Sequence, residues 1–90
     1  MRKPYTIKDL FNNTEAIIDL FEIADIHAVS SCFNPYTDEE VELEDECCHI
    51  YMNDDKEYLA KLSISEVLYF SKQMWKSKVK DNVREIFKER

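Results

Sequence analysis

The 90-residue sequence contains no glycine and only two prolines. Glycine-rich phosphate-binding loops need glycine where the backbone approaches a phosphate closely, so motifs of this kind are excluded. Cysteine is also scarce: there are three, an odd number for a disulfide framework, and the neighbours Cys47 and Cys48 would lie on opposite faces of a strand. This cysteine content favours a reducing, intracellular setting.

A long apolar run is missing as well. Charged residues interrupt the apolar stretches, and no apolar segment follows the basic residues of the N-terminal MRKPYTIKDL. The sequence therefore predicts neither a signal peptide nor a membrane span. With 44% hydrophobic and 34% charged residues, residues 1–90 are expected to fold as a single globular domain.

Positive charge is absent from the first half of the chain. From Asp9 to Asp55 there are fourteen acidic residues and no lysine or arginine, whereas residues 71–90 carry seven positive and three negative charges. The net charge of −7 thus hides an acidic first half and a basic tail. An acid-rich surface repels nucleic-acid phosphate and anionic lipid, so the favoured partner of the acidic half is a cationic protein.

The segment TIKDLFNNTEAIIDLFEIAD, residues 6–25, places apolar residues at helical spacing. Thr6 is a suitable N-cap, and Asp9 would lie in the positively polarised first turn. An N-terminal helix is therefore predicted. The polar cluster at residues 12–14 leaves open whether it is continuous or split in two, because such side chains compete for backbone hydrogen bonds. The apolar positions are Ile7, Leu10, Phe11, Ile17, Ile18 and Phe21.

Three strands are expected to follow. The run IHAVSSCF, residues 26–33, is rich in β-branched residues and ends before NPYTDEE, where Pro35 lacks a backbone donor. In VELEDECCHIYM the apolar positions shift from odd to even numbers, which predicts a bend near residues 44–46. The segments CCHIYM and EYLAKLSI flank NDDK, whose Asn and Asp tolerate the positive φ of a hairpin turn.

Ser63 and Glu66 form a capping-box pattern at the start of an amphipathic run. The apolar period predicts a C-terminal helix of about two dozen residues, or two helices that bend near Lys78. The expected fold is an α+β domain with an N-terminal helix, a three-stranded antiparallel sheet covered on one face, and one long or two short C-terminal helices (αβββα or αβββαα).

Few residues offer catalytic or metal-binding chemistry. Cysteine and histidine are zinc ligands, but no CxxC or HxxxH pair is present, and free cysteine is commonly a small buried apolar residue. A Cys–His nucleophile pair lacks a third group to orient the base, and a carboxylate acid–base pair needs a concave site. We therefore expect no catalytic residue, no metal and no cofactor. The residues considered are His27, Cys32, Cys47, Cys48 and His49.

The acidic run is the first candidate binding surface. A solvated edge strand that only blocks aggregation needs a few charges of either sign, whereas this run has one sign and no lysine. Carboxylates on a rigid sheet can occupy sites where a basic groove expects phosphates. The competing interpretation is a well-solvated hairpin without a partner. The candidate residues are Asp38, Glu39, Glu40, Glu42, Glu44, Asp45, Glu46, Asp54 and Asp55, joined by Glu57 across the predicted hairpin.

The alternative candidate surface is basic. Tyr69, Lys72, Lys76, Lys80 and Arg84 recur every three or four residues and would form one stripe on the last helix. Such a stripe can bind nucleic acid, with the tyrosine stacking on a base. Lysines also favour the C-terminal halves of helices for dipole and solubility reasons, so direct nucleic-acid binding is the less favoured interpretation.

The chain resembles small acidic inhibitors that phages make against host defence nucleases, notably anti-CRISPR proteins. The resemblance rests on length, acidity and the predicted order of a helix, three strands and two helices; it covers nearly the whole chain and includes no diagnostic motif. It implies that the carboxylates of residues 38–46, with Asp54 and Asp55, replace the phosphates of the PAM-bearing duplex in a basic groove. The basic tail departs from the all-acidic pattern, which leaves room for self-association through Tyr69, Phe70 and Trp75.

Together these features predict a non-enzymatic, cytoplasmic inhibitor, in the host cell if phage-encoded. Its acidic hairpin face would bind a basic host protein such as a nuclease or another defence effector. The alternative is a small nucleic-acid-binding or transcription-regulating protein that acts through the basic helix. A homodimer that buries Trp75 also remains open, because a chain of this length with a long amphipathic helix often needs a second copy to cover it. No membrane contact is expected.

Overall fold

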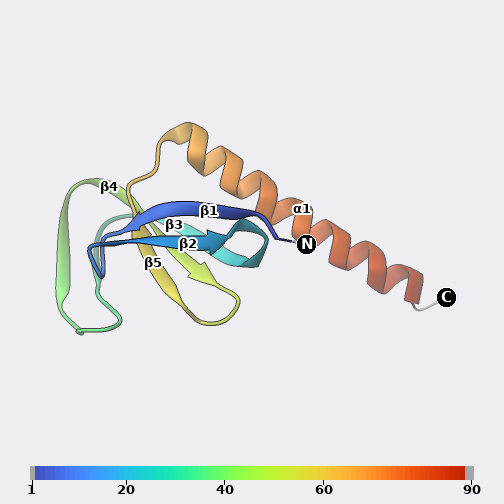
Figure 1. Ribbon diagram of the computed structural model, residues 1–90, viewed down its shortest axis with the longest axis horizontal. Helices are drawn as coiled ribbons and strands as arrows, with labels where there is room; N and C mark the ends of the chain where they lie inside the picture. Colours follow the sequence, from blue (N-terminus) through green and yellow to red (C-terminus); the bar gives the residue numbers. More distant parts are fainter. Residues whose placement is uncertain (1, 89–90) are drawn as a thin grey trace.

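The computed structural model describes the backbone of residues 2–88 and the side chains of residues 2–78. In this part of the chain two antiparallel sheets precede one long helix (Figure 1). The first sheet pairs β1 (Pro4–Asp9) with β2 (Thr14–Asp19). The second has the order β3 (Ile23–Phe33), β4 (Glu40–Met52), β5 (Glu57–Ala60), and it is followed by α1 (Ile64–Lys88).

The predicted N-terminal helix is wrong, and with it the predicted αβββα or αβββαα arrangement. Residues 4–19 form a hairpin, in which Thr6 pairs with Ile17 instead of capping a helix. Ile18 is 3% exposed whereas its neighbour Ile17 is 73% exposed, which is the alternation of a strand with one buried face. The turn is made where the polar cluster interrupts the apolar pattern, with Asn13 at a φ of 54°.

A buried carboxylate concealed this alternation in the sequence. Tyr5, Ile7 and Asp9 point inward along β1, and Asp9 is only 1% exposed. Asp9 accepts hydrogen bonds from the backbone amides of Phe11 and Leu59, at 3.1 and 3.2 Å. In the sequence, an aspartate is expected to face solvent, so the inward position of Asp9 interrupts the two-residue alternation of the strand. The helical spacing of the apolar residues was favoured instead.

A short 3-10 turn, η1 (Leu20–Glu22), follows the N-terminal hairpin along the chain and contacts α1 in space. Asp19 precedes it and accepts hydrogen bonds from the amides of Phe21 and Lys3, both at 3.0 Å. The Ser77 hydroxyl of α1 donates to the Phe21 carbonyl oxygen at 3.1 Å. The Asp19 bonds close the turn, and the Ser77 bond holds it against the middle of the helix.

Three local predictions are confirmed. The bend in β4 is present: Val29 faces Cys47 but Ser31 faces Glu42, so residues 43–46 bulge opposite a single residue. The NDDK segment is the β4–β5 turn, with Asp55 at a φ of 69°. In the capping box, the Ser63 hydroxyl accepts from the Glu66 amide at 3.1 Å, and the Glu66 carboxylate accepts from the Ser63 amide at 3.2 Å.

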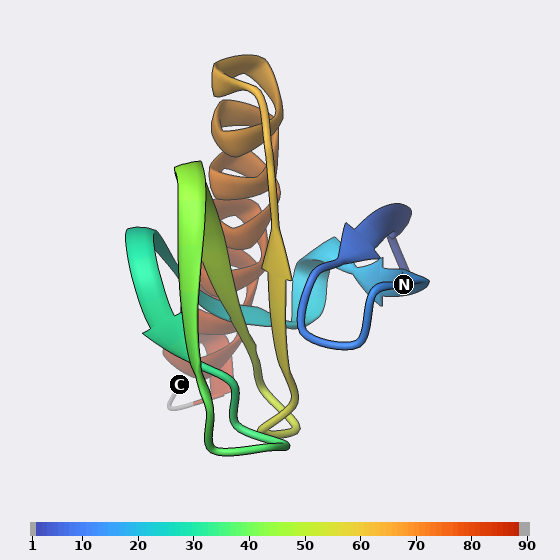
Figure 2. The same ribbon diagram turned by 90° about the vertical axis from the view of Figure 1, so that its left-hand side faces the viewer.

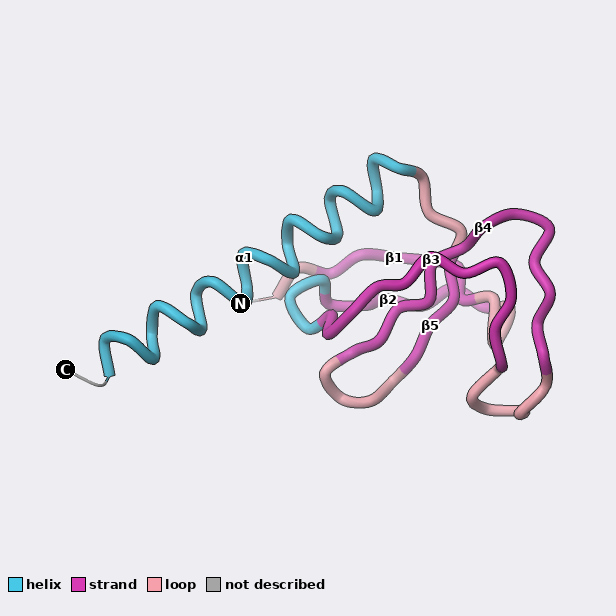
Figure 3. Tube along the Cα trace, turned by 180° about the vertical axis from the view of Figure 1, so that it is seen from behind, coloured by secondary structure: helices cyan, strands magenta, loops and turns pink. Residues whose placement is uncertain are grey.

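The strand predicted over residues 26–33 is present as β3, and it begins three residues earlier, at Ile23. The C-terminal segment is one continuous helix, so the alternative of two helices is wrong. Its last turns run past the end of both sheets, as the views from the front and from behind show (Figures 1 and 3). Only the first half of the helix therefore has strands to pack against.

The main core lies between the two sheets and the first half of α1. Phe70 is fully buried, and Tyr5 packs against it edge to face with ring centroids 4.8 Å apart. The Tyr5 hydroxyl also donates to the Glu66 carboxylate at 2.8 Å. A smaller cluster of Phe11, Cys47 and Leu59 lies on the other face of the second sheet. The buried residues of the main core are Ile7, Ile18, Leu20, Ile23, Ile50, Met52, Ala60 and Phe70.

Ile17 and Ile18 distinguish the observed hairpin from the helix that the apolar spacing of residues 6–25 predicted. Ile18→Ala should lower the free energy of unfolding by about 2–5 kcal/mol, because it opens a cavity in the core. Ile17→Ala removes the same atoms from an exposed position and should change it by less than about 0.5 kcal/mol. Urea unfolding of both variants measures this difference. Equal losses for the two variants would contradict the hairpin.

Candidate acidic binding surface

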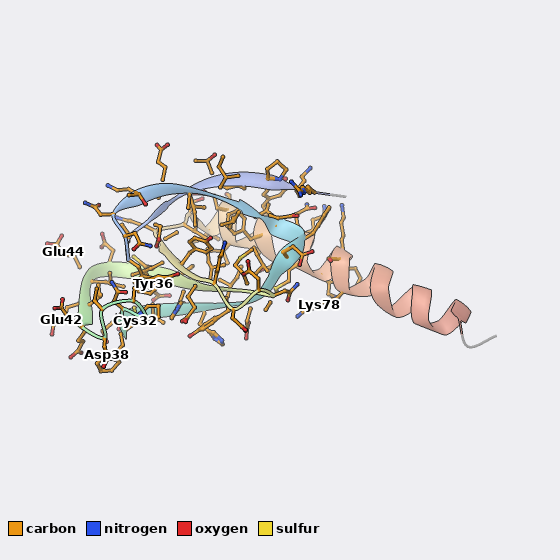
Figure 4. All side chains as sticks on the ribbon, turned by 60° about the horizontal axis from the view of Figure 1, so that its bottom comes forward. Cys32, Tyr36, Asp38, Glu42, Glu44 and Lys78 are labelled. Carbon is orange, nitrogen blue, oxygen red and sulfur yellow. The ribbon has the colours of Figure 1, made fainter. Side chains whose placement is uncertain are left out.

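The candidate surface lies at one end of the long axis of the molecule. The loop after β3 and the first part of β4 carry seven carboxylates, all on exposed residues, which we call the acidic end: Asp38, Glu39, Glu40, Glu42, Glu44, Asp45 and Glu46. Asp38, Glu42 and Glu44 lie together at this end, whereas Lys78 lies on the helix far from them (Figure 4). The structure therefore gathers the acidic run of residues 38–46.

The first part of β4 displays its acids because it alternates. Glu40, Glu42 and Glu44 are exposed, whereas Val41 and Leu43 are partly buried against the small Phe11–Cys47–Leu59 cluster. Apolar side chains under one face of the strand thus turn the carboxylates outward. The bulge at residues 43–46 then returns the chain to the three-stranded sheet.

Buried Asn34 holds the loop that precedes these acids. Its side-chain amide donates to the Phe11 carbonyl oxygen at 3.1 Å, and its side-chain oxygen accepts from the Tyr36 amide at 2.9 Å. Its backbone also exchanges hydrogen bonds with the loop: its amide donates to Glu39, and its carbonyl accepts from Asp38. Asp38 adopts a φ of 59°, which an aspartate tolerates. The loop is therefore fixed to the N-terminal hairpin.

A second anchor for this loop comes from the first residue of β5, Glu57. The Tyr36 hydroxyl donates to the Glu57 carbonyl oxygen at 3.1 Å, and the Glu57 carboxylate lies 2.9 Å from Nε2 of buried His49. The Tyr51 hydroxyl lies 3.2 Å from Nδ1 of the same histidine, and the two rings are stacked. Because both ring nitrogens already have partners, this group fits a structural network better than a catalytic base.

One cation pairs with the acidic end among the described side chains. Lys61 Nζ lies 2.7 Å from Asp45 Oδ2, and this hydrogen bond lowers the pKa of Asp45 and raises that of Lys61. Both side chains are well exposed, so the pair contributes little to stability. The other six carboxylates carry negative charge without an ion-pair partner from the described residues.

Asp54 and Asp55 do not lie with the other predicted acids. They belong to the β4–β5 turn, and Asp54 borders a groove with Arg2, Asp19 and Glu22 beside the N-terminal hairpin. Asp54 also lies 3.9 Å from Lys56, its neighbour in the turn. Glu57, which was expected to join the acidic face, instead faces His49. The nine predicted residues therefore form two separate groups.

The alternative basic stripe is only partly available. Lys72 and Lys76 are exposed on α1, but Tyr69 is half-buried, and its ring lies 6.1 Å from that of Tyr5. A tyrosine packed in this way is a poor platform for a base. Lys80 and Arg84 lie on the helix backbone, and their side chains fall outside the described residues.

The cysteines and histidines considered as zinc ligands are not arranged around a common metal position in the described residues, although Cys32 packs near Cys47. Within residues 2–78 no group of three or more His, Cys, Asp or Glu side chains is arranged to hold a metal ion. His27 lies 3.0 Å from Asp25 on the exposed part of β3. Burial raises the pKa of all three cysteine thiols, which lowers the fraction present as reactive thiolate. Packing therefore accounts for the cysteines.

Sequence reasoning missed two residues that build the acidic end, Asn34 and Asp9. Asparagine directly before Pro35 is typical of a turn in which the side chain bonds backbone two residues on, and this signal was present. Its second contact, with Phe11, spans 23 residues and had no local signal. The same holds for the bond between Asp9 and Leu59.

Comparison with models of known protein families, with curated proteins and with solved structures finds no match to this chain. In the part of the chain that the structure describes, no helix is both long enough and apolar enough to cross a membrane. The functional argument therefore depends on the geometry and charge of the molecule itself.

Asn34→Ala should lower the free energy of unfolding by about 1–3 kcal/mol, because the Phe11 carbonyl oxygen and the Tyr36 amide lose their partner. Thr37→Ala is the matched control: it shortens an exposed side chain of the same loop and should cost less than about 0.5 kcal/mol. Chemical unfolding of the two variants checks this order. A harmless Asn34→Ala would show that the loop is not held by this side chain.

Proposed function

We propose that this protein is a non-enzymatic binding protein whose acidic end docks in a basic groove of a nucleic-acid-acting protein and inhibits it. The observation that carries the proposal is the gathering of seven exposed carboxylates at one end, only one of them paired with a described cation. Close like charges repel one another, and a cationic partner relieves that repulsion on binding.

The arrangement of the acids supports a partner that normally binds phosphate. Alternate residues along a regular strand lie about 6.5 Å apart, so Glu40 and Glu42 form a row of negative charges along one face, and exposed Glu44 follows them in the bulge. Phosphates along a nucleic-acid strand also form a row of single negative charges at spacings of this order. A groove lined with Lys and Arg can therefore accept the strand in place of a nucleic acid.

The rigid mounting of the acidic end also supports binding. Asn34 and Tyr36 fix the loop, and the small Phe11–Cys47–Leu59 cluster supports the strand. Charges held in place before binding lose less conformational entropy when the complex forms. Asp54 and Asp55 are left out of this surface because they belong to the β4–β5 turn, where Asp54 lies beside the N-terminal hairpin.

The resemblance to phage-encoded anti-CRISPR inhibitors is weaker than the sequence indicated. The expected order of a helix, three strands and two helices is absent from residues 2–88, so the resemblance now rests on length and acidity. The proposed target class is therefore a basic nucleic-acid-acting protein, such as a nuclease or another defence effector, without a more specific assignment. A cytoplasmic location fits three cysteines that the structure leaves free.

Neutralising the acidic end tests the proposal. The quadruple variant Asp38→Asn, Glu40→Gln, Glu42→Gln, Glu44→Gln should lose a partner that the tagged wild type captures from host-cell lysate, because the row of negative charge is removed. The captured protein should then release its nucleic acid when purified wild-type protein is added. Higher salt should weaken the capture, since screening reduces the attraction between exposed charges.

A control with the same change in charge keeps this test specific. Glu15→Gln, Glu22→Gln, Asp54→Asn and Asp55→Asn neutralise four exposed acids outside the acidic end and should leave the capture intact. Equal capture by wild type and both quadruple variants would refute the proposed surface. Capture of nucleic acid instead of protein, abolished by Lys72→Gln with Lys76→Gln, would favour the basic helix in its place.

A further inference from the structure

The second sheet has one covered edge and one open edge. The order β3-β4-β5 makes β3 and β5 its edges. Beside β5 lies the N-terminal hairpin, since the Leu10 amide donates to the Leu59 carbonyl oxygen at 2.7 Å. Seen along the long axis, the hairpin stands on the β5 side, and no described strand covers β3 on the other side (Figure 2).

The open edge has little of the charge and proline that commonly protect an edge strand, although register shifts interrupt β3 between Ile23 and Asp25 and between Val29 and Ser31. Natural edge strands are commonly short, or carry lysine or proline, because unpaired backbone groups invite another strand. β3 is 11 residues long, and its segment IHAVSSCF contains no lysine, arginine, aspartate, glutamate or proline. Residues 26–29 pair with β4 in regular register, so this part of the strand is straight enough to accept a neighbour.

An apolar groove follows the same edge on the helix side. Ile26 and Ala28 of β3 line the groove together with Ile64, Val67 and Leu68 of α1, and Glu46 of the acidic end borders it. Ile64 and Leu68 are 81% and 66% exposed, and Trp75, two turns further along, is 66% exposed. Spacings of four and seven residues put these three on one stripe of the helix.

The sequence repeats this stripe in the last turns of the helix. Ile64, Trp75 and Ile86 are spaced by 11 residues, as are Leu68 and Val79. Eleven residues make about three full turns, so the apolar spacing follows one line along α1 from its first turn to its last.

We infer that the open edge of β3 and the stripe on α1 are the interface with a second copy of this chain. The β3 strands of the two copies would pair antiparallel about a two-fold axis perpendicular to the sheet. The two three-stranded sheets then form one sheet of six strands, with both helices on the same face. Such a contact closes on itself and removes the open edge.

Charge complementarity identifies a second copy as the occupant. β3 runs toward the acidic end, whereas α1 passes the start of β3, where Lys78 Nζ lies 3.5 Å from the Ala24 carbonyl oxygen, and then continues beyond the sheets. Antiparallel pairing reverses the second copy, so its acidic end comes level with the overhanging part of α1. Residues 72–88 contain six lysines and arginines and two acids, against seven acids in residues 38–46. The symmetric dimer makes this contact twice.

The test is the mass in solution of the full chain and of three lysine variants, by light scattering across a dilution series. The wild type should show twice the 10.8 kDa mass of one chain. Ala28→Lys on the edge and Leu68→Lys on the stripe should each raise the dimer dissociation constant by about tenfold or more, because a charge must be desolvated in the contact. Ile17→Lys, at an equally exposed apolar residue on the opposite side, should leave the dimer unchanged.

Salt tests the arrangement of the two copies. The dimer should weaken as salt is raised, and it should weaken in the quadruple variant of Asp38, Glu40, Glu42 and Glu44, because the acidic end faces the basic helix of the other copy. A dimer that ignores both changes would overturn the antiparallel arrangement. A wild type that is monomeric at every concentration, or a dimer that survives both Ala28→Lys and Leu68→Lys, would overturn the interface itself.

The inference stands apart from the proposed function. Ala28→Lys removes none of the seven carboxylates of the acidic end and lies near only Glu46 in the groove, so a monomeric Ala28→Lys protein that captures the target shows that target binding does not need the dimer. Because the helix of the second copy and the target would both use the acidic end, added target should dissociate the dimer. Capture of the target by an undissociated dimer would contradict the shared use of that end.

Discussion

The buried carboxylate of Asp9 joins the two halves of this small fold. It accepts the amide of Leu59 from β5, the amide of Phe11, and the side-chain amide of Asn12 at 2.9 Å. A buried acid is costly unless its oxygens are hydrogen-bonded, and here both oxygens have partners. The N-terminal hairpin is thereby placed beside β5, and Phe11 is placed under the loop that carries the acidic end.

From that placement follows the shape of the candidate surface. Phe11 supplies both the small apolar cluster under β4 and the carbonyl oxygen that Asn34 binds. Val41 and Leu43 of β4 pack against this cluster, so the acids that alternate with them along the strand point outward. The same hairpin covers the β5 edge, so the open edge of the sheet is on the β3 side. The hydrogen bond between Asp9 and Leu59 thus places the hairpin so that the β5 edge of the second sheet is covered and the β3 edge is open.

Charge divides the molecule along its length in the same way. The acidic end and the overhanging basic part of α1 lie at opposite ends of a particle with extents of 50 × 27 × 20 Å. At this separation the two regions of one copy are largely screened from each other at physiological salt. Each is therefore free to attract a charge of opposite sign on another molecule, whether a basic target or the reversed second copy. This separation links the proposed function to the inferred dimer.

The sequence by itself determined the features that depend on neighbouring residues: the NDDK turn, the capping box of Ser63 and Glu66, the C-terminal helical segment though not its continuity, and the bend in β4 read from its change of phase. Tertiary structure decided the rest. Residues 6–25 have a helical spacing, yet Asp9 can lie inward because Leu59, 50 residues away, donates to it, and that partner makes the strand pattern the stable one. In the same way, Asp54 is close in sequence to the acidic run, but the direction of the β4–β5 hairpin carries it to the groove beside Asp19 and Glu22. Local signals act through adjacent backbone, whereas burial and charge gathering depend on contacts that only the folded chain brings together.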